Sequence, residues 1–156
     1  EYTTRWKFNA SLFELPHHFF SWLNPGEYED RILDKTKRLL GFVFALLYAY
    51  LFFKRTKHRE DLIQHWYLLF ATICVISPTL HPWYLIWLVP VLCLFPNRAW
   101  VLLTGLLMAS YTILDGWVNE GVWEESIVLR WAMFVPFYGL LLWDFLNKQI
   151  DRGMGE

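Results

Sequence analysis

The sequence predicts an all-α fold: a multi-pass transmembrane helical bundle of about five spans with an interfacial N-terminal segment. Of its 156 residues, 56% are hydrophobic and 19% charged, and no Asp, Glu, Lys or Arg occurs in residues 62–95. One helix needs only roughly 20 apolar residues to cross a bilayer, so we expect the chain to cross more than once. This pattern argues against a soluble enzyme. The net charge of −1 gives no electrostatic case for a nucleic-acid partner.

Residues 1–38 are predicted to form an extracytoplasmic, interfacial loop with a short amphipathic helix. They mix Trp and Phe with charges and prolines, and no window is apolar enough to span. Trp and Tyr side chains favour the headgroup layer, where their rings are buried and their polar edges stay hydrated. The sequence opens on Glu1 without an apolar leader, so we expect the later part of a longer membrane protein, or one piece of a split one.

Five apolar segments follow, and together they form a predicted transmembrane domain over residues 39–146. A polar tail of residues 147–156 comes after them. Pro78 and Pro82 separate the second segment from the third, because proline lacks an N–H and disfavours helical geometry in the residue before it. The predicted spans are residues 39–53, 62–76, 83–95, 99–114 and 126–146.

The loop charges predict the orientation of these spans. Basic residues in the loops between spans and in the tail all fall on one side of the predicted bundle, which the positive-inside rule makes cytoplasmic. The start of the chain, His81 and the acidic loop of residues 115–125 then face outward, and the C-terminus is cytoplasmic. The basic residues are Lys54, Arg55, Lys57, Arg59, Arg98, Lys148 and Arg152. The exception is Lys35, Lys37 and Arg38, which precede the first span on the outer side, where they can snorkel toward lipid phosphates and acidic neighbours offset them.

His81 is the most informative polar residue, because it lies in the predicted helix break. Irregular backbone at membrane depth persists only where protein or a wet cavity satisfies it. A histidine there can donate to a phosphate, carry a proton or bind a metal. The competing interpretation is a hydrated histidine in a headgroup-layer turn.

Arg130 is the second candidate, inside the fifth span. An arginine there needs an anionic partner or a route to the surface, and its fork of donors suits a phosphate. The alternative is that it snorkels to lipid headgroups.

The remaining polar groups give weaker signals. Arg5, Trp6, Asn9 and Ser11 form a cluster suited to sugar or phosphate contacts. Asp115 and Glu120 are fallback candidates for a base, although carboxylates in an outer loop are more often simply solvated. His17 and His18 lie in a predicted surface segment, where they could bind metal adventitiously. Cys74 and Cys93 are interpreted as packing residues, and no metal site is predicted.

Two stretches resemble a known family. YTTRWKFNASLFEL (residues 2–15) and SPTLHPWYLIWLVP (residues 77–90) resemble the C-terminal halves of bacterial multi-pass glycosyltransferases of the GT-C type. The likeness is to the polyprenyl-phosphate-mannose-dependent (GT87-type) mannosyltransferases and covers residues 1–97.

The resemblance implies an outward-facing enzyme in the bacterial plasma membrane that moves a hexose, mannose by this likeness, from a polyprenyl phosphate to an acceptor hydroxyl with inversion. In that family an aspartate in an outward loop near the N-terminus is the general base. No catalytic residue is therefore expected in this chain, and the isolated chain is expected to be inactive. The implied donor-binding residues are His81, Tyr84, Arg5, Trp6, Asn9 and Ser11, with Arg130 added from its position.

No cofactor is expected, because the lipid-linked sugar donor is itself the substrate. The expected partners are membrane lipid, the polyprenyl-phosphate sugar donor, and an N-terminal half or partner subunits. The main alternative is a non-catalytic membrane scaffold subunit derived from the same fold, which would bind partner subunits, lipid or a pigment. A transporter fragment is a weaker alternative, since no repeated pair of broken helices is evident.

Overall fold

A computed structural model describes residues 7–56, 58–121 and 125–153 of the chain. The described residues form helices and connecting segments without a strand, which confirms the predicted all-α class. The chain divides into two compact units, Glu1–Val91 and Leu92–Glu156.

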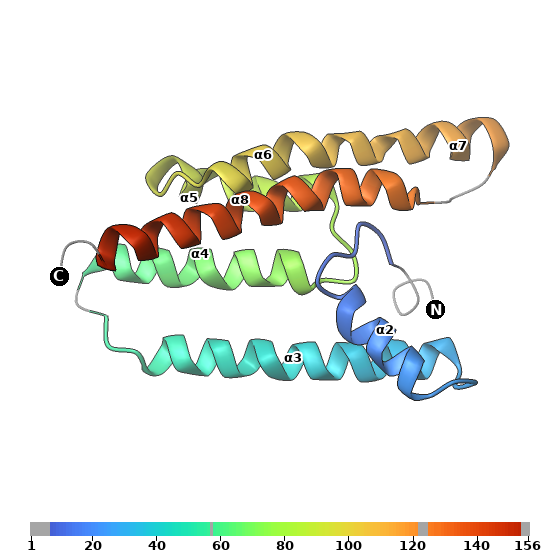
Figure 1. Cartoon of the computed structure of the whole chain (residues 1–156), viewed down its shortest axis with the longest axis horizontal. Coiled ribbons are helices and arrows are strands. Elements are labelled where there is room, and N and C mark those ends of the chain that lie inside the picture. The colour runs from blue at the N-terminus through green and yellow to red at the C-terminus, as the bar shows by residue number, and fades with distance from the viewer. Residues whose placement is uncertain (1–6, 57, 122–124, 154–156) are drawn as a thin grey trace. The chain divides into compact units, whose positions relative to one another are not determined.

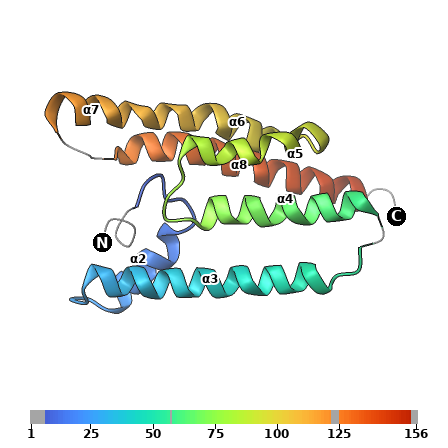
Figure 2. The same cartoon turned by 180° about the vertical axis from the view of Figure 1, so that it is seen from behind.

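The first unit is built on two long helices, α3 (Glu29–Phe53) and α4 (Arg59–Ile76), which pack side by side in opposite directions (Figures 1 and 2). A shorter helix, α2 (Glu14–Leu23), packs against α3. After α4 the chain forms a 3₁₀ helix, η1 (Pro82–Trp87), and then the short helix α5 (Val89–Leu94), which continues past the boundary of the unit.

Local sequence features explain where these helices begin and end. Gly26 adopts φ +92°, a conformation that glycine tolerates best, in the turn from α2 to α3. At the start of α4 the backbone N–H of His58 donates to Asp61 Oδ2 at 3.1 Å, which fixes the first turn. The helix then ends at Ile76, because Ser77 precedes a proline and is held in extended backbone at ψ 140°.

The second unit is a pair of antiparallel helical segments. The first runs through α6 (Arg98–Leu106), η2 (Leu107–Thr112) and α7 (Ile113–Glu120), and the second is α8 (Ile127–Gly153). The side chain of Asn97 caps α6 by accepting from two backbone N–H groups, those of Ala99 at 3.0 Å and Trp100 at 3.2 Å.

Large apolar side chains fill the contact between α6 and α8. The rings of Trp100 and Phe137 meet edge to face with centroids 4.9 Å apart. Phe137 and Leu103 are fully buried, and Met133 is 1% exposed. At the start of α6, two residues before Trp100, Arg98 forms an ion pair with Asp144 of α8, so polar groups flank the apolar contact.

Within the described residues, three helical segments are long and apolar enough to cross a membrane: Glu29–Phe53, Arg98–Asn119 and Ile127–Ile150. They contain the first, fourth and most of the fifth predicted spans. The second predicted span lies in α4, whose first turn carries three charges, Arg59, Glu60 and Asp61. The third, residues 83–95, is divided between η1 and α5.

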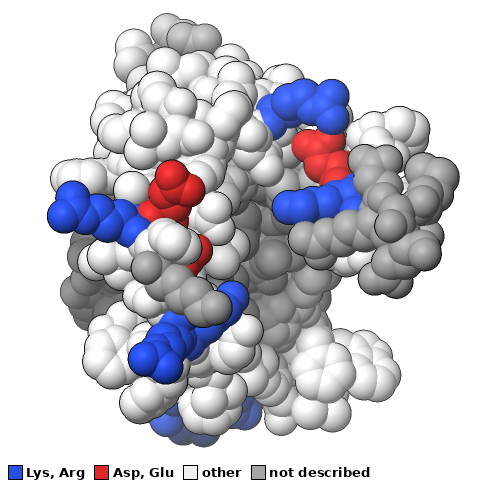
Figure 3. All heavy atoms as spheres, turned by 90° about the vertical axis from the view of Figure 1, so that its left-hand side faces the viewer, with Lys and Arg blue, Asp and Glu red and all other residues white. Residues whose placement is uncertain are grey.

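The apolar side chains of these helices mostly face outward. Only 11% of the apolar window in α3 is buried within the structure, and Phe42, Leu46 and Phe53 are all exposed. Figure 3, which looks at the left-hand side of Figure 1, shows Lys and Arg side chains with a few Asp or Glu side chains among the described residues of that face. Exposed apolar surface of this extent is what a lipid-facing helix presents, and the chain is a membrane protein.

Both predicted domain boundaries fall inside helices. Helix α3 begins at Glu29 rather than at residue 39, because the charged residues before the apolar run continue the same helix. Helix α8 continues to Gly153, so described residues 147–153 of the predicted tail are helical. The short helix expected within residues 1–38 corresponds to α2, which exposes Leu15, Phe19 and Trp22.

Candidate functional site

The N-terminal segment pairs with the helix break after α4. Phe8 donates its N–H to the Pro78 carbonyl at 3.0 Å and accepts from the Leu80 N–H at 2.8 Å, which makes a parallel bridge between Phe8 and Thr79. Further along, the Leu12 N–H donates to the Val75 carbonyl at 3.0 Å. The two stretches that carry the family resemblance, distant in sequence, therefore lie side by side.

This pairing satisfies backbone groups that the prolines leave outside any helix. Ser77 strengthens the break, since its hydroxyl donates to the Thr79 carbonyl at 2.6 Å and accepts from the Thr79 N–H at 3.2 Å. Pro82 then opens η1, where the missing N–H costs nothing. The break is thus a defined piece of structure, with His81 at its last position before η1.

His81 is buried, with 6% of its surface exposed, and aromatic rings contact it. Its ring stacks on Trp83, with centroids 4.1 Å apart and planes 8° apart, and meets Tyr84 edge-on at 5.5 Å. The Phe8 ring lies 4.8 Å away at a tilt of 34°. Burial lowers the pKa of His81 below its ordinary value, so the neutral imidazole is favoured near pH 7.

Asn9 lies at the centre of the pairing and is 1% exposed. Its backbone is left-handed at φ +52°, a region that Asn enters more readily than most residues. Its Nδ2 donates to the Leu80 carbonyl at 3.0 Å. The side chain predicted to contact sugar or phosphate is therefore engaged with the backbone beside His81.

The other predicted binding residues have varied surroundings. Ser11 is partly buried, and its carbonyl accepts from the Glu14 N–H at 3.1 Å at the start of α2. Tyr84 is 40% exposed on η1. Arg5 and Trp6 lie outside the described residues. The structure therefore brings together His81, Asn9 and Tyr84, with Ser11 two residues beyond Asn9.

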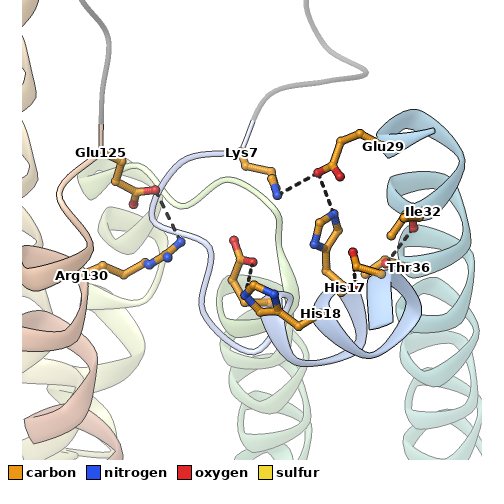
Figure 4. A network of polar contacts seen from close by, with 10 residues as sticks. Lys7, His17, His18, Glu29, Ile32, Thr36, Glu125 and Arg130 are labelled. Atoms are coloured by element: carbon orange, nitrogen blue, oxygen red, sulfur yellow. Dashed lines mark hydrogen bonds and ion pairs between the residues drawn. The ribbon is translucent and has the colours of Figure 1, made fainter. Parts of the chain in front are cut away.

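Arg130 belongs to the second unit, near the start of α8. Its guanidinium lies 3.6 Å from the Glu125 carboxylate, and its side chain is 21% exposed (Figure 4). The sequence predicted that Arg130 needs an anionic partner, and the Glu125 carboxylate of the same unit lies close enough to be one.

A second polar cluster in the first unit was not expected from the sequence. His17 was predicted to lie in a surface segment, but it is 4% exposed, with Nε2 3.0 Å from Glu29 Oε1. Lys7 Nζ lies 3.2 Å from the same oxygen, so the cluster ties the N-terminal segment and α2 to the start of α3 (Figure 4). Burial, followed by the charge of Lys7, lowers the pKa of His17. By contrast His18 is exposed and faces Glu14 at 3.4 Å.

Burial of His17 depends on the turn at Gly26, which returns the chain so that Glu29 faces α2. A single histidine in a polar aromatic stretch carries no signal of that contact. The only sequence hint is the spacing of apolar residues that buries Phe13 and Leu33 in one cluster beside it.

Comparison with known families gives one match. The sequence model described as the MptB C-terminal domain matches residues 17–115, well over half of the chain. MptB is a mannosyltransferase, so the match supports the mannosyltransferase part of the resemblance. The matched range contains most of α2, all of α3 and α4, and the break with His81, while residues 8–12 and Arg130 lie outside it. No curated protein and no solved structure matches the chain.

Proposed function

We propose that this chain, which belongs to the MptB C-terminal domain family, is the donor-binding part of a GT-C (GT87-type) membrane glycosyltransferase that moves mannose from a polyprenyl phosphate to an acceptor hydroxyl. The observation that carries the proposal is the pairing of residues 7–12 with the break after α4, which holds His81 among aromatic rings at one end of the α3–α4 pair.

In this proposal the His81 imidazole donates a hydrogen bond to the donor phosphate. The phosphate gains negative charge as the glycosidic bond breaks, and a donor fixed in advance stabilises that charge in the transition state. Since burial lowers the pKa of His81, it acts as a neutral donor rather than as a permanent cation. The general base that activates the acceptor hydroxyl comes from another part of the complete enzyme.

The polyprenyl chain requires an apolar surface open to the bilayer next to the phosphate. Helix η1 offers one, because Trp83, Ile86 and Trp87 are exposed by 46%, 66% and 68%. Trp83 also stacks on His81, so the apolar surface begins at the candidate phosphate contact. Tyr84, half exposed beside them, is available for the sugar or the phosphate.

We assign this end of the first unit to the outer face of the bacterial plasma membrane. Residues 7–28 and the break lie at the end where α3 begins and α4 ends. The opposite end carries the basic residues Lys54, Arg55 and Arg59. The positive-inside rule then makes the second end cytoplasmic.

The test is sugar transfer by the complete membrane enzyme from polyprenyl-phosphate-mannose, comparing His81→Ala with His18→Ala. A lost hydrogen bond to a charged group is worth about 1.5–3 kcal/mol, so turnover or donor affinity should fall roughly 10- to 150-fold for His81→Ala. His18 is exposed on α2 and serves as the matched histidine control. Wild-type kinetics for His81→Ala at normal expression would remove His81 from the donor site, and no mannose transfer by the wild-type enzyme would refute the proposed reaction.

A further inference from the structure

We propose that Phe8 and Asn9 are positioning residues for His81: they hold its backbone and ring in the helix break and do not themselves contact the donor. This inference rests on the proposed function only in assigning a purpose to His81. The arrangement it describes can be tested without any sugar donor.

Asn9 acts through the peptide that precedes His81. Its Nδ2 donates to the Leu80 carbonyl at 3.0 Å, and the side chain is 1% exposed. Leu80 itself is completely buried. A carbonyl held in a fixed direction fixes the plane of the peptide leading into His81, and so the direction in which the His81 side chain leaves the backbone.

The left-handed backbone of Asn9 also helps to hold the peptide before His81. At φ +52° the chain turns so that the Phe8 carbonyl can accept from the Leu80 N–H at 2.8 Å while the Asn9 amide reaches the Leu80 carbonyl. Both backbone polar groups of Leu80 are therefore bonded to the Phe8-Asn9 pair. Few side chains combine tolerance of this backbone region with a donor of the right length.

Phe8 acts on the His81 ring directly. Its own ring is 3% exposed and lies 4.8 Å from the His81 ring, while its N–H and carbonyl both bond to the break. It therefore contributes to the burial that lowers the pKa of His81. A direct role in ligand binding would need exposed polar atoms, and neither side chain offers them.

The experiment measures diethyl pyrocarbonate modification of individual histidines by mass spectrometry, using the full-length protein in lipid nanodiscs. The variants are Asn9→Gly, which keeps the left-handed backbone but removes the amide, and Phe8→Leu, which keeps an apolar side chain but removes the ring. Lys7→Ala is the neighbouring control, because the Lys7 side chain faces Glu29. His17 and His18 are internal references, one buried and one exposed.

In Asn9→Gly we expect the modification rate of His81 to rise roughly 2- to 12-fold, the factor by which losing about one neutral hydrogen bond shifts a local opening equilibrium. In Phe8→Leu the backbone hydrogen bonds remain, and we expect the rate to rise because the ring that covers His81 is removed. His17 should stay protected in these two variants, and His81 should keep its wild-type rate in Lys7→Ala. In Phe8→Leu the pH midpoint of His81 modification should also move up toward its ordinary value of 6.5, since less burial favours the charged form.

An unchanged His81 rate in both variants would overturn the proposal. An equal rise at His17 would overturn it as well, because Phe8 and Asn9 would then support the fold generally. The transfer assay separates this inference from the proposed function. If the labelling changes as expected but His81→Ala transfers mannose normally, Phe8 and Asn9 position His81, but His81 is not part of the donor site. If His81→Ala loses transfer but the labelling is unchanged, His81 belongs to the donor site, but Phe8 and Asn9 do not position it.

Discussion

The imidazole of His81 lies flat on the indole of Trp83, with ring centroids 4.1 Å apart and an angle of 8° between their planes. Stacking of this kind covers one face of the imidazole and leaves hydrogen bonding to the nitrogen atoms at the ring edge. Because Trp83 is itself 46% exposed, the stack joins a buried histidine to the molecular surface. A ligand that meets His81 must therefore approach beside an aromatic ring.

Replacing His81 by Gln should recover part of the transfer activity lost in His81→Ala. The lowered pKa of His81 favours its neutral form, and a glutamine amide can also donate a neutral hydrogen bond. Steady-state kinetics of the complete enzyme with varied donor concentration would measure the recovery. Activity of His81→Gln as low as that of His81→Ala would mean that the imidazolium charge or a proton is needed.

The stability of the protein should fall on acidification below about pH 6.5. Burial lowers the pKa of both His17 and His81 from 6.5, so between the folded and the unfolded pKa values the unfolded chain binds more protons. The free energy of unfolding therefore rises with pH in this window. The contribution that the two neutral histidines make to it is fully present above about pH 6.5 and is lost as the pH falls through their folded pKa values. Thermal unfolding in detergent at pH 7.5 and pH 5.0 would measure the difference.

The double variant His17→Gln, His81→Gln should show a weaker pH dependence of the unfolding midpoint, while His18→Gln should keep that of the wild type. The charged groups around His17 are Lys7, which opposes its protonation, and Glu29 and Glu14, which favour it. A midpoint that declines equally in wild type and double variant would assign the acid sensitivity to the carboxylates.

Phe137→Ala should destabilise the second unit strongly. Phe137 is fully buried against Trp100, and removing such a ring from a packed core costs about 3–5 kcal/mol. Phe145 on the same helix is 58% exposed, so Phe145→Ala should change stability by only about 0.5 kcal/mol. Denaturation in mixed micelles, followed by tryptophan fluorescence, would compare the two. If Phe137→Ala lost no more stability than Phe145→Ala, the contact between α6 and α8 would contribute little to stability.

A cysteine at Asn119 should react with a membrane-impermeant maleimide in intact cells, and a cysteine at Thr56 should react only after the cells are opened. Both positions are exposed, and the predicted topology puts the first outside and the second in the cytoplasm. The native Cys74 and Cys93 are replaced by Ala beforehand, since Cys93 is exposed. The opposite labelling pattern would invert the orientation.

The long helices were predictable from their long apolar runs. Such a run suits the interior of a bilayer, where a helix satisfies its own backbone hydrogen bonds. The early start of α3 at Glu29 was less evident, since a helix outside the bilayer may carry charges freely and composition no longer marks its end. The third predicted span shows the converse. Its composition suits a bilayer, but Pro82 and Pro90 lack the N–H that a continuous α-helix needs. The segment forms the short helices η1 and α5 instead of one long helix.

The candidate site was predictable only in its parts. His81 was identified by the break around it, and Asn9 and Ser11 by their polarity among aromatic residues. Their arrangement depends on backbone hydrogen bonds from Phe8 to Pro78 and Leu80, and such bonds leave little trace in side-chain patterns. Polarity marks Asn9 as a candidate for ligand contact, but it gives no sign of the hydrogen bond from its amide to the Leu80 carbonyl. The burial of His17 depends likewise on a distant partner, Glu29.

The pairing of Phe8 and Asn9 with the break also has a consequence for the order of biogenesis. The Asn9 amide and the Leu80 carbonyl are 71 positions apart in sequence, and both α3 and α4 lie between them. The ribosome has therefore released the whole intervening hairpin before the two ends can meet, and closing so long a loop is among the slower steps of folding. The Asn9–Leu80 contact can therefore form only after both α3 and α4 have been made, so we expect substitutions at its residues to leave insertion of these two helices unhindered.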